Sequence, residues 1–305
     1  MHRVLLTGAT GFVGGHLARR LAGRGVEVVA LTRPGSRSPV PPGVVAVPVP
    51  DRPADLESAV RAARPDVCAH LATLFLAQHR REDVVPLLEA NLVLGTRLAE
   101  ALVAVGGVPL VDVGTVWQHV TGAAYCPANL YAATKQAMVD VLTSYALRGV
   151  LPLVRLTLTD TYGPLDPRRR LVPAPVAAAA QGTPVELSSG HQLVDLVHIT
   201  DVVDAFDATL TRMCDAHEPL VPAPDGSTRF GVSSGAPVSV RDLVATLDSV
   251  SPRPVDARWG ARPDRPIEMR EPWDVGPSVP GWSPAVTLAD GLAELVAEGR
   301  AGAGG

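Results

Sequence analysis

The sequence predicts an α/β fold in which a doubly wound parallel sheet is joined to a smaller domain, and two observations carry this prediction. In the first half of the chain, short β-branched or leucine-rich runs alternate with longer helical patterns, as in repeated β-α-β units. After position 163 the rhythm changes to proline- and arginine-rich loops between isolated helices. We therefore expect a large nucleotide-binding domain over residues 1–163, to which parts of 192–235 return, and a smaller, discontinuous α/β domain over 164–305.

Six segments are expected to form the strands of the sheet: 4–6, 26–31, 44–47, 67–71, 110–113 and 153–156. Each is a short β-branched or leucine-rich run, as expected of strands in a parallel sheet. One expected helix carries His16, Leu17 and Leu21 directly after the first strand, and another carries Tyr131 and Lys135 after the fifth.

Composition excludes several classes of protein. The formal net charge is −4 and there is no basic stripe with interleaved aromatic residues, so we expect no nucleic-acid partner. The first residues match neither a signal peptide nor a membrane span, so we expect a cytoplasmic protein without a membrane partner. Cys68, Cys126 and Cys214 are widely spaced and have no metal-ligand spacing, which predicts neither disulfides nor a metal site.

Glycines at positions 8, 11 and 14 follow the first strand and open the first helix. They permit a tight turn, close approach of the backbone to a pyrophosphate, and close packing of helix on strand. A purely structural turn is the alternative. The spacing T-G-x-x-G-x-x-G resembles the extended short-chain dehydrogenase/reductase family (the NAD-dependent epimerases and dehydratases), and the resemblance covers nearly the whole chain. It implies a Rossmann-type domain that binds a nicotinamide dinucleotide.

The loop after the second strand indicates which dinucleotide is preferred. An NAD-binding site would place an acidic residue there, but this chain has Arg33, Ser36 and Arg37, which suit a 2′-phosphate. This favours NADP(H) over NAD(H); the alternative is a solvated basic loop. The resemblance adds Asp51 as an adenine contact. It also adds the segment after His70, although that histidine could equally be a satisfied core residue. Asn91 is at least as consistent with bracing the central strands as with a catalytic relay.

The complete set of expected cofactor-binding residues is Gly8, Thr10, Gly11, Phe12, Val13, Gly14, Arg33, Ser36, Asp51, Leu71, Ala72, Thr73, Asn91, Tyr131, Lys135, Leu158 and Tyr162.

The strongest catalytic signal is Tyr131 and Lys135, because their spacing places both side chains on one face of a helix. A neighbouring ammonium lowers a tyrosine pKa and makes the phenol a general acid or base. Thr115 comes at the end of the expected fifth strand, where it could hydrogen-bond a substrate oxygen; a strand-end cap is the alternative. We expect these three residues to be the catalytic set.

The segments 114–119 and 125–137 are similar to the abequose-synthase branch, which implies a 4-ketoreductase for CDP- or dTDP-linked deoxyhexoses. No acidic pair follows Thr115, which argues against a dehydratase. The expected substrate-binding residues are Trp117, Gln118, His119, Asp160, Arg168, Val172, His191 and Arg262.

Two positions depart from the family pattern. Asp160 replaces an asparagine that contacts the sugar nucleotide in many relatives, and Val194 replaces an arginine that often binds diphosphate. A carboxylate repels a diphosphate, so compensation would have to come from the arginines at 168–170 or from those at 262, 265 and 270. The resemblance also implies that Asp195 and Asp201 brace loops and helix starts.

The sequence is thus interpreted as an NADPH-dependent reductase of the 4-keto group of a nucleotide-linked (dTDP or CDP) deoxyhexose, acting in deoxysugar or natural-product biosynthesis. Three alternatives stay open: an NAD-dependent nucleotide-sugar epimerase, a reductase of a non-nucleotide ketone, and a non-catalytic NADP sensor. The family expectation is a homodimer formed by helix pairs that include the Tyr131 helix.

Overall fold

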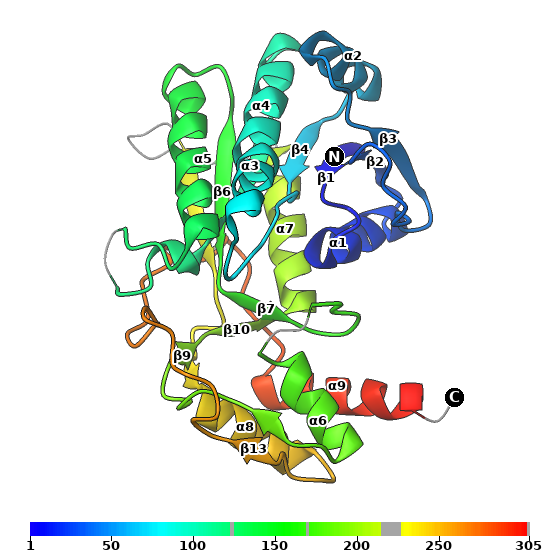
Figure 1. The fold of residues 1–305 in the computed structure, drawn as a ribbon. Helices are drawn as coiled ribbons and strands as arrows, with labels where there is room; N and C mark the ends of the chain where they lie inside the picture. Colours follow the sequence, from blue (N-terminus) through cyan, green and yellow to red (C-terminus); the bar gives the residue numbers. More distant parts are fainter. Residues whose placement is uncertain (123–124, 169–170, 215–226, 304–305) are drawn as a thin grey trace.

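A parallel sheet forms the centre of the larger part of the computed structural model (Figure 1). The model describes residues 1–122, 125–168, 171–214 and 227–303. Within these residues the sheet has seven strands in the order β11-β6-β5-β4-β1-β2-β3. They are β1 (Arg3–Thr7), β2 (Glu27–Thr32), β3 (Val44–Pro48), β4 (Val67–His70), β5 (Leu110–Thr115), β6 (Leu153–Leu158) and β11 (Ser227–Val232). The strand order reverses between β1 and β4, which confirms the predicted doubly wound, Rossmann-type sheet.

The six predicted strands coincide with β1 to β6, and their ends differ by at most two residues. The edge strand β11, which pairs with β6, was not predicted. Its first half is polar and it follows a proline-rich stretch, so it is less rich in β-branched residues and leucine than the predicted strands.

Helices cover both faces of the sheet. On one face, α1 (Phe12–Gly23) and α7 (Ile199–Met213) share an apolar core that includes Leu17, Leu21 and Phe206. On the other, α2 (Pro53–Ala63), α4 (Leu94–Ala104) and α5 (Leu130–Leu147) bury residues such as Leu98 and Leu142. A short helix α3 (Val84–Leu88) lies between the turns η1 (Arg81–Asp83) and η2 (Glu89–Val93), and η2 runs into α4.

A smaller part has an apolar core of its own, at the bottom of Figure 1. Its helices are α6 (Pro173–Gln181), α8 (Val240–Val250) and α9 (Leu288–Ala303). Pairs of two-residue strands complete it: β8 (Val185–Glu186) with β13 (Ala257–Arg258), and β9 (Leu193–Val194) with β12 (Val238–Ser239). The chain enters this part after β7, returns to the sheet with α7 and β11, and then enters it again.

The two parts meet at a pair of parallel strands, β7 (Asp160–Tyr162) and β10 (Leu196–His198). These strands continue from the carboxyl end of β6 and lead into α7. In the described part of the chain, no helix combines the length and the apolar character needed to span a bilayer.

Candidate active site

The glycine turn after β1 requires glycine at two positions. Gly8 has a φ of +79°, and a Cβ there would lie 2.7 Å from the backbone nitrogen of Ala72. A Cβ on Gly14 would lie 2.2 Å from the carbonyl oxygen of Gly8. Gly11 is the N-cap of α1 and has no side chain to cap the first N–H groups of that helix. A helix N-terminus of this kind, at the point where the strand order reverses, fits a dinucleotide pyrophosphate.

Thr7, which was not predicted, fixes the loop that faces this turn. Its hydroxyl accepts a hydrogen bond from Ala72 N at 3.0 Å and lies 2.8 Å from His70 Nδ1. His70 is buried, and burial lowers its pKa to about 4 even though Asp112 acts in the opposite direction. His70 is therefore a satisfied core histidine, as the second interpretation of the sequence had it.

The side-chain amide of Asn91 forms four hydrogen bonds within the protein. Its Oδ1 accepts from Leu74 N at 2.7 Å and from the Thr73 hydroxyl at 2.9 Å. Its Nδ2 donates to Leu74 O and to the hydroxyl of Thr134 on α5, each at 3.0 Å. Two acceptor sites and two donors fill the amide. Asn91 and Thr73, both expected at the cofactor, thus join the loop after β4 to the Tyr131 helix.

Arg33, Ser36 and Arg37 lie together in the loop after β2, where they line an open hollow. A tight turn, in which Ser36 N donates to Arg33 O at 3.1 Å, holds the loop. Among the residues described, neither guanidinium forms an ion pair, so both remain able to bind a phosphate. Asp51 is exposed in the loop after β3, and its carbonyl accepts from Arg97.

The three predicted catalytic residues are buried at the carboxyl end of β5. Thr115 ends that strand, and Tyr131 and Lys135 lie in the first two turns of α5, whose N-cap Asn129 accepts from Ala132 N at 3.0 Å. Their relative exposures are 8%, 9% and 4%, so their polar groups are largely shielded from bulk water. Such shielding strengthens electrostatic interactions in this part of the molecule.

Gln118 couples the strand end to the helix. Its Oε1 accepts from Thr115 N at 2.9 Å, and its Nε2 donates to Gln136 Oε1 on α5 at 2.8 Å. The side chain was expected to line a sugar pocket. Instead it occupies the short turn η3 (Val116–Gln118) and holds Thr115 in register with α5.

Lys135 is the only lysine in the sequence. Burial lowers its pKa, Asp112 on β5 acts in the opposite direction, and Arg155 on β6 lowers it further. Asp112 and Arg155 form a buried ion pair with 3.6 Å between Oδ2 and Nε. The sequence analysis predicted neither Asp112 nor Arg155 as a neighbour of Lys135.

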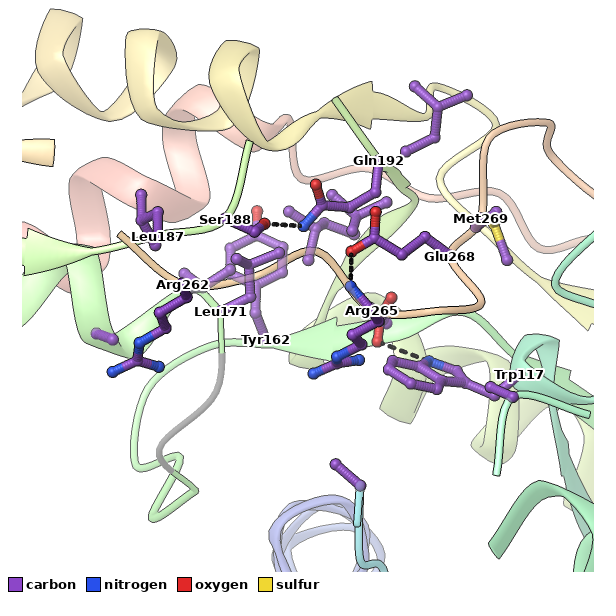
Figure 2. Close-up of a pocket in the computed structure, with 18 of the residues that line it drawn as sticks. Trp117, Tyr162, Leu171, Leu187, Ser188, Gln192, Arg262, Arg265, Glu268 and Met269 are labelled. Carbon is purple, nitrogen blue, oxygen red and sulfur yellow. Dashed lines mark hydrogen bonds between the residues drawn. The ribbon is translucent and has the colours of Figure 1, made fainter. Parts of the chain in front are cut away.

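A pocket opens between the two parts of the molecule (Figure 2). Its walls are largely apolar, with Leu171, Leu187 and Met269 among them. At one end the ring of Trp117 donates from Nε1 to Asp160 at 3.2 Å and lies 5.1 Å from the Arg265 guanidinium.

Phe75 connects this pocket to Tyr131, the tyrosine predicted to transfer the proton. Its ring meets Tyr131 edge to face at 4.9 Å and Trp117 at 6.2 Å. Sequence reasoning missed it, although its place two residues after Thr73 was a usable signal because that loop was expected to face the cofactor.

The pocket brings together four of the predicted substrate residues, namely Trp117, Asp160, Val172 and Arg262. The other four, which do not line it, are Gln118, His119, Arg168 and His191. His119 stacks on Trp273 at 3.6 Å, and His191 is exposed.

Arg168 binds Asp166 and lies 4.4 Å from the ring of Phe12, so it faces the glycine turn. Arg169 and Arg170 lie outside the described residues. Within the described ranges, no cluster of His, Cys, Asp or Glu side chains has the arrangement of a metal site.

Comparison with known proteins is consistent with this geometry. A model of the NAD dependent epimerase/dehydratase family matches residues 4–219. The dTDP-6-deoxy-L-talose 4-dehydrogenase (NAD(P)(+)) of Kitasatospora kifunensis is 28% identical over 96% of this chain and 94% of its own. A 3-diazoavenalumate denitrifying reductase of Streptomyces sp is 31% identical over 68% and 72%.

Two further similarities bear on the expected branch and fold. A CDP-abequose synthase of Salmonella typhimurium is 24% identical over 81% of this chain and 80% of its own. The structure of MoeE5 in complex with UDP-glucose and NAD aligns with a TM-score of 0.81 at 26% identity and covers 99% of both chains.

Proposed function

Since the chain belongs to the NAD dependent epimerase/dehydratase family, we propose that it is an enzyme that reduces the 4-keto group of a nucleotide-linked deoxyhexose with NADPH. The observation that carries this proposal is the burial of Thr115, Tyr131 and Lys135 at the carboxyl end of β5, beside a pocket that Trp117 lines. A protein that only sensed a dinucleotide would not need this proton-transfer set.

The glycine turn and the N-terminus of α1 hold the cofactor's pyrophosphate, and Lys135 holds the ribose next to the nicotinamide. The bound cofactor supplies the hydride. Arg33, Ser36 and Arg37 bind the 2′-phosphate, which favours NADPH over NADH. The name of the Kitasatospora relative, a dehydrogenase for NAD(P)(+), agrees with such a preference, whereas MoeE5 was solved with NAD.

Tyr131 and Thr115 handle the ketone oxygen. The Thr115 hydroxyl acts as an acceptor in the capping of η3, where Trp117 N donates to it at 3.3 Å, and its own proton can be donated to the substrate oxygen. Tyr131 donates the proton that completes the alcohol, and the ammonium of Lys135 stabilises the phenolate that remains. The hydride and the proton together reduce the ketone to a secondary alcohol.

Nucleotide-linked sugars are the preferred substrates because two of the relatives are named for dTDP- and CDP-linked sugars and MoeE5 was solved with UDP-glucose. Arg262 and Arg265 line the pocket and suit a diphosphate. Such chemistry belongs to deoxysugar or natural-product biosynthesis in the cytoplasm. We also propose a homodimer in which α5 takes part.

A second candidate is the reduction of a substrate without a nucleotide. The pocket lining carries the carboxylates of Asp160, Glu186 and Glu268, and Val194 stands where relatives often have an arginine. Carboxylates and an apolar wall disfavour a diphosphate and suit an aromatic or aliphatic ketone. The Streptomyces relative, named for a diazo substrate, supports this reading.

The test is a titration of the purified protein with NADPH and NADH, followed by cofactor-oxidation assays on dTDP- and CDP-4-keto-6-deoxyglucose. Turnover with NADPH supports the first candidate. Tight NADPH binding without sugar turnover, together with oxidation in the presence of aryl or alkyl ketones, supports the second. Interconversion of sugar epimers on tightly held NAD without net oxidation contradicts both candidates.

Tyr131→Phe tests the proton donor. The variant should bind NADPH as the native protein does but lose turnover by roughly 10²–10⁴-fold, because only the hydroxyl is removed. Fluorescence titration of NADPH and steady-state kinetics measure the two effects. Near-native turnover would remove Tyr131 from the proposed role.

A further inference from the structure

A row of polar side chains crosses the sheet on one face. Thr7, His70, Asp112 and Arg155 occupy registered positions on the neighbouring strands β1, β4, β5 and β6. Registered residues of parallel strands point to the same face. All four are at most 5% exposed.

Helices α4 and α5 cover this row. His70 lies under Gly95 of α4, where a Cβ would come within 2.9 Å of His70 Nε2. Arg155 Nη2 donates to Val139 O on α5 at 3.3 Å. Lys135, one turn earlier on the same helix, is 4% exposed and interacts electrostatically with Asp112, Arg155 and His70. The row therefore lies beneath α5, the helix that carries Lys135.

The carboxylate of Asp112 interacts with two buried cations, Lys135 and Arg155. Burial alone would raise the pKa of Asp112, but Lys135 and Arg155, with a smaller contribution from His70, hold it below its ordinary value. Arg155 is always charged, and His70, with a pKa of about 4, is neutral near pH 7. Among the groups that act on Lys135 from β4, β5 and β6, Asp112 is the anion.

The contact between Arg155 Nε and the Asp112 carboxylate is an ion pair without a hydrogen bond. The 3.6 Å between Arg155 Nε and Asp112 Oδ2 is too long for a hydrogen bond. The flanking residues on β5, Val111 and Val113, are apolar, as expected of a central parallel strand. An apolar side chain at position 112 would serve the strand at least as well, because burying an ion pair rarely adds stability. The carboxylate needs another explanation.

We propose that Asp112 is a positioning residue for the proton transfer by Tyr131, in that its buried carboxylate keeps Lys135 charged against the repulsion of Arg155. The inference rests on the proposed function, since it assigns Lys135 to catalysis. Its consequence is that the ammonium which stabilises the Tyr131 phenolate depends on a residue that touches neither substrate nor cofactor.

The test uses the fact that Lys135 is the only lysine. Protein grown on ε-¹³C-lysine gives a single lysine side-chain NMR signal, whose shift against pH reports the Lys135 pKa without cofactor or turnover. In Asp112→Asn that pKa should fall by about one unit or more, because a carboxylate raises the pKa of a neighbouring ammonium. Asp140→Asn, which removes an exposed carboxylate from the same helix, should leave it unchanged.

A second pair of variants covers the case in which Asp112→Asn folds poorly. Arg155→Met removes the opposing cation and should raise the Lys135 pKa, and Asp112→Asn/Arg155→Met should lie below Arg155→Met by the contribution of Asp112. Circular dichroism confirms the fold of each variant. A Lys135 pKa that is the same with and without Asp112 in folded proteins would overturn the proposal.

Kinetics separate the catalytic consequence from a structural one. In Asp112→Asn the alkaline limb of kcat for ketone reduction should move to lower pH along with the Lys135 pKa, while KM at neutral pH changes little. A uniform loss of kcat without a shift of the limb would make Asp112 a structural residue only. If the native protein reduced no ketone, the proposed function would fail, and the NMR titration would still decide the coupling.

Discussion

Thr115 and Tyr131, which would meet a substrate, are each held by a neighbouring side chain. Gln118 fixes the backbone of Thr115 to α5, and Phe75 places an aromatic edge against Tyr131. Below them, His70 and Asp112 belong to one buried polar row. Buried polar networks of this kind are sensitive to the protonation state of each member.

His70 should make the fold acid-sensitive. Its folded pKa of about 4 lies below the ordinary 6.5, so the folded state favours the neutral ring. The contribution of neutral His70 to the free energy of unfolding is present above pH 6.5 and is lost as the pH falls towards 4. Between about pH 7.5 and about pH 5, urea unfolding should show a loss of about 2 kcal/mol from this group. His70→Gln should abolish that part of the loss.

The exposed His79 supplies the matched control, and His79→Gln should keep the native pH dependence. If the native protein and His70→Gln lost the same free energy of unfolding at low pH, a group other than His70 would be responsible for that loss.

Sequence alone indicated the three proposed catalytic residues but not the residues that surround and hold them. The spacing of Tyr131 and Lys135 is a local property of one helix, so a pattern can reveal it. The proposed role of Asp112 depends on its interactions with Arg155 and Lys135. These residues lie far from Asp112 in the chain and come close to it only through strand order and helix packing. The bond from Gln118 to Gln136 was not predicted for the same reason, because Gln136 lies on the next helix.

Among the elements, the turn between β1 and α1 is the most constrained. Gly14 packs against Gly8 with no room for a side chain, and backbone atoms form the obstacle. The short glycine pattern in the sequence was sufficient to predict this element. By contrast, β11 and the junction strands β7 and β10 carry no such local signal, since pairing with distant strands defines them.

Gly14→Ala should disrupt this turn. The new Cβ would lie 2.2 Å from Gly8 O and 2.7 Å from Gly8 C, so helix and strand must separate. We expect a loss of about 1–3 kcal/mol in the free energy of unfolding. NADPH affinity should fall roughly tenfold, which is about 1.4 kcal/mol of binding free energy. Denaturant titration and fluorescence binding measure both.

Gly23→Ala is the matched control at the other end of α1, where a Cβ would meet nothing within 4 Å. It should leave NADPH affinity unchanged and raise stability slightly through helix propensity. If Gly14→Ala bound NADPH as well as Gly23→Ala did, the close approach at Gly8 would not matter for the cofactor.

For the molecule as a whole, the connection between the two parts depends on a few hydrogen-bonded polar residues. The resemblance to the family predicted bracing roles for Asp195 and Asp201, and the hydrogen bonds confirm them. Asp195 accepts from Ser234 N at 2.9 Å, and Asp201, at the start of α7, accepts from Ala285 N and Val286 N at 3.0 Å. The segment that Asp201 holds leads directly into α9 of the smaller part.

Asp201→Ala should therefore loosen the smaller part from the sheet. The change leaves two backbone N–H groups without their charged acceptor, and each such group costs about 1–3 kcal/mol, so we expect a loss of about 3 kcal/mol in the free energy of unfolding. Limited proteolysis should become faster at residues 283–287. Asp204→Ala is the control on the same helix, because its ion pair with Arg20 is partly exposed and worth at most about 1 kcal/mol. Equal losses in the two variants would show that α7, rather than the contact of Asp201 with the segment before α9, sets the stability of the junction.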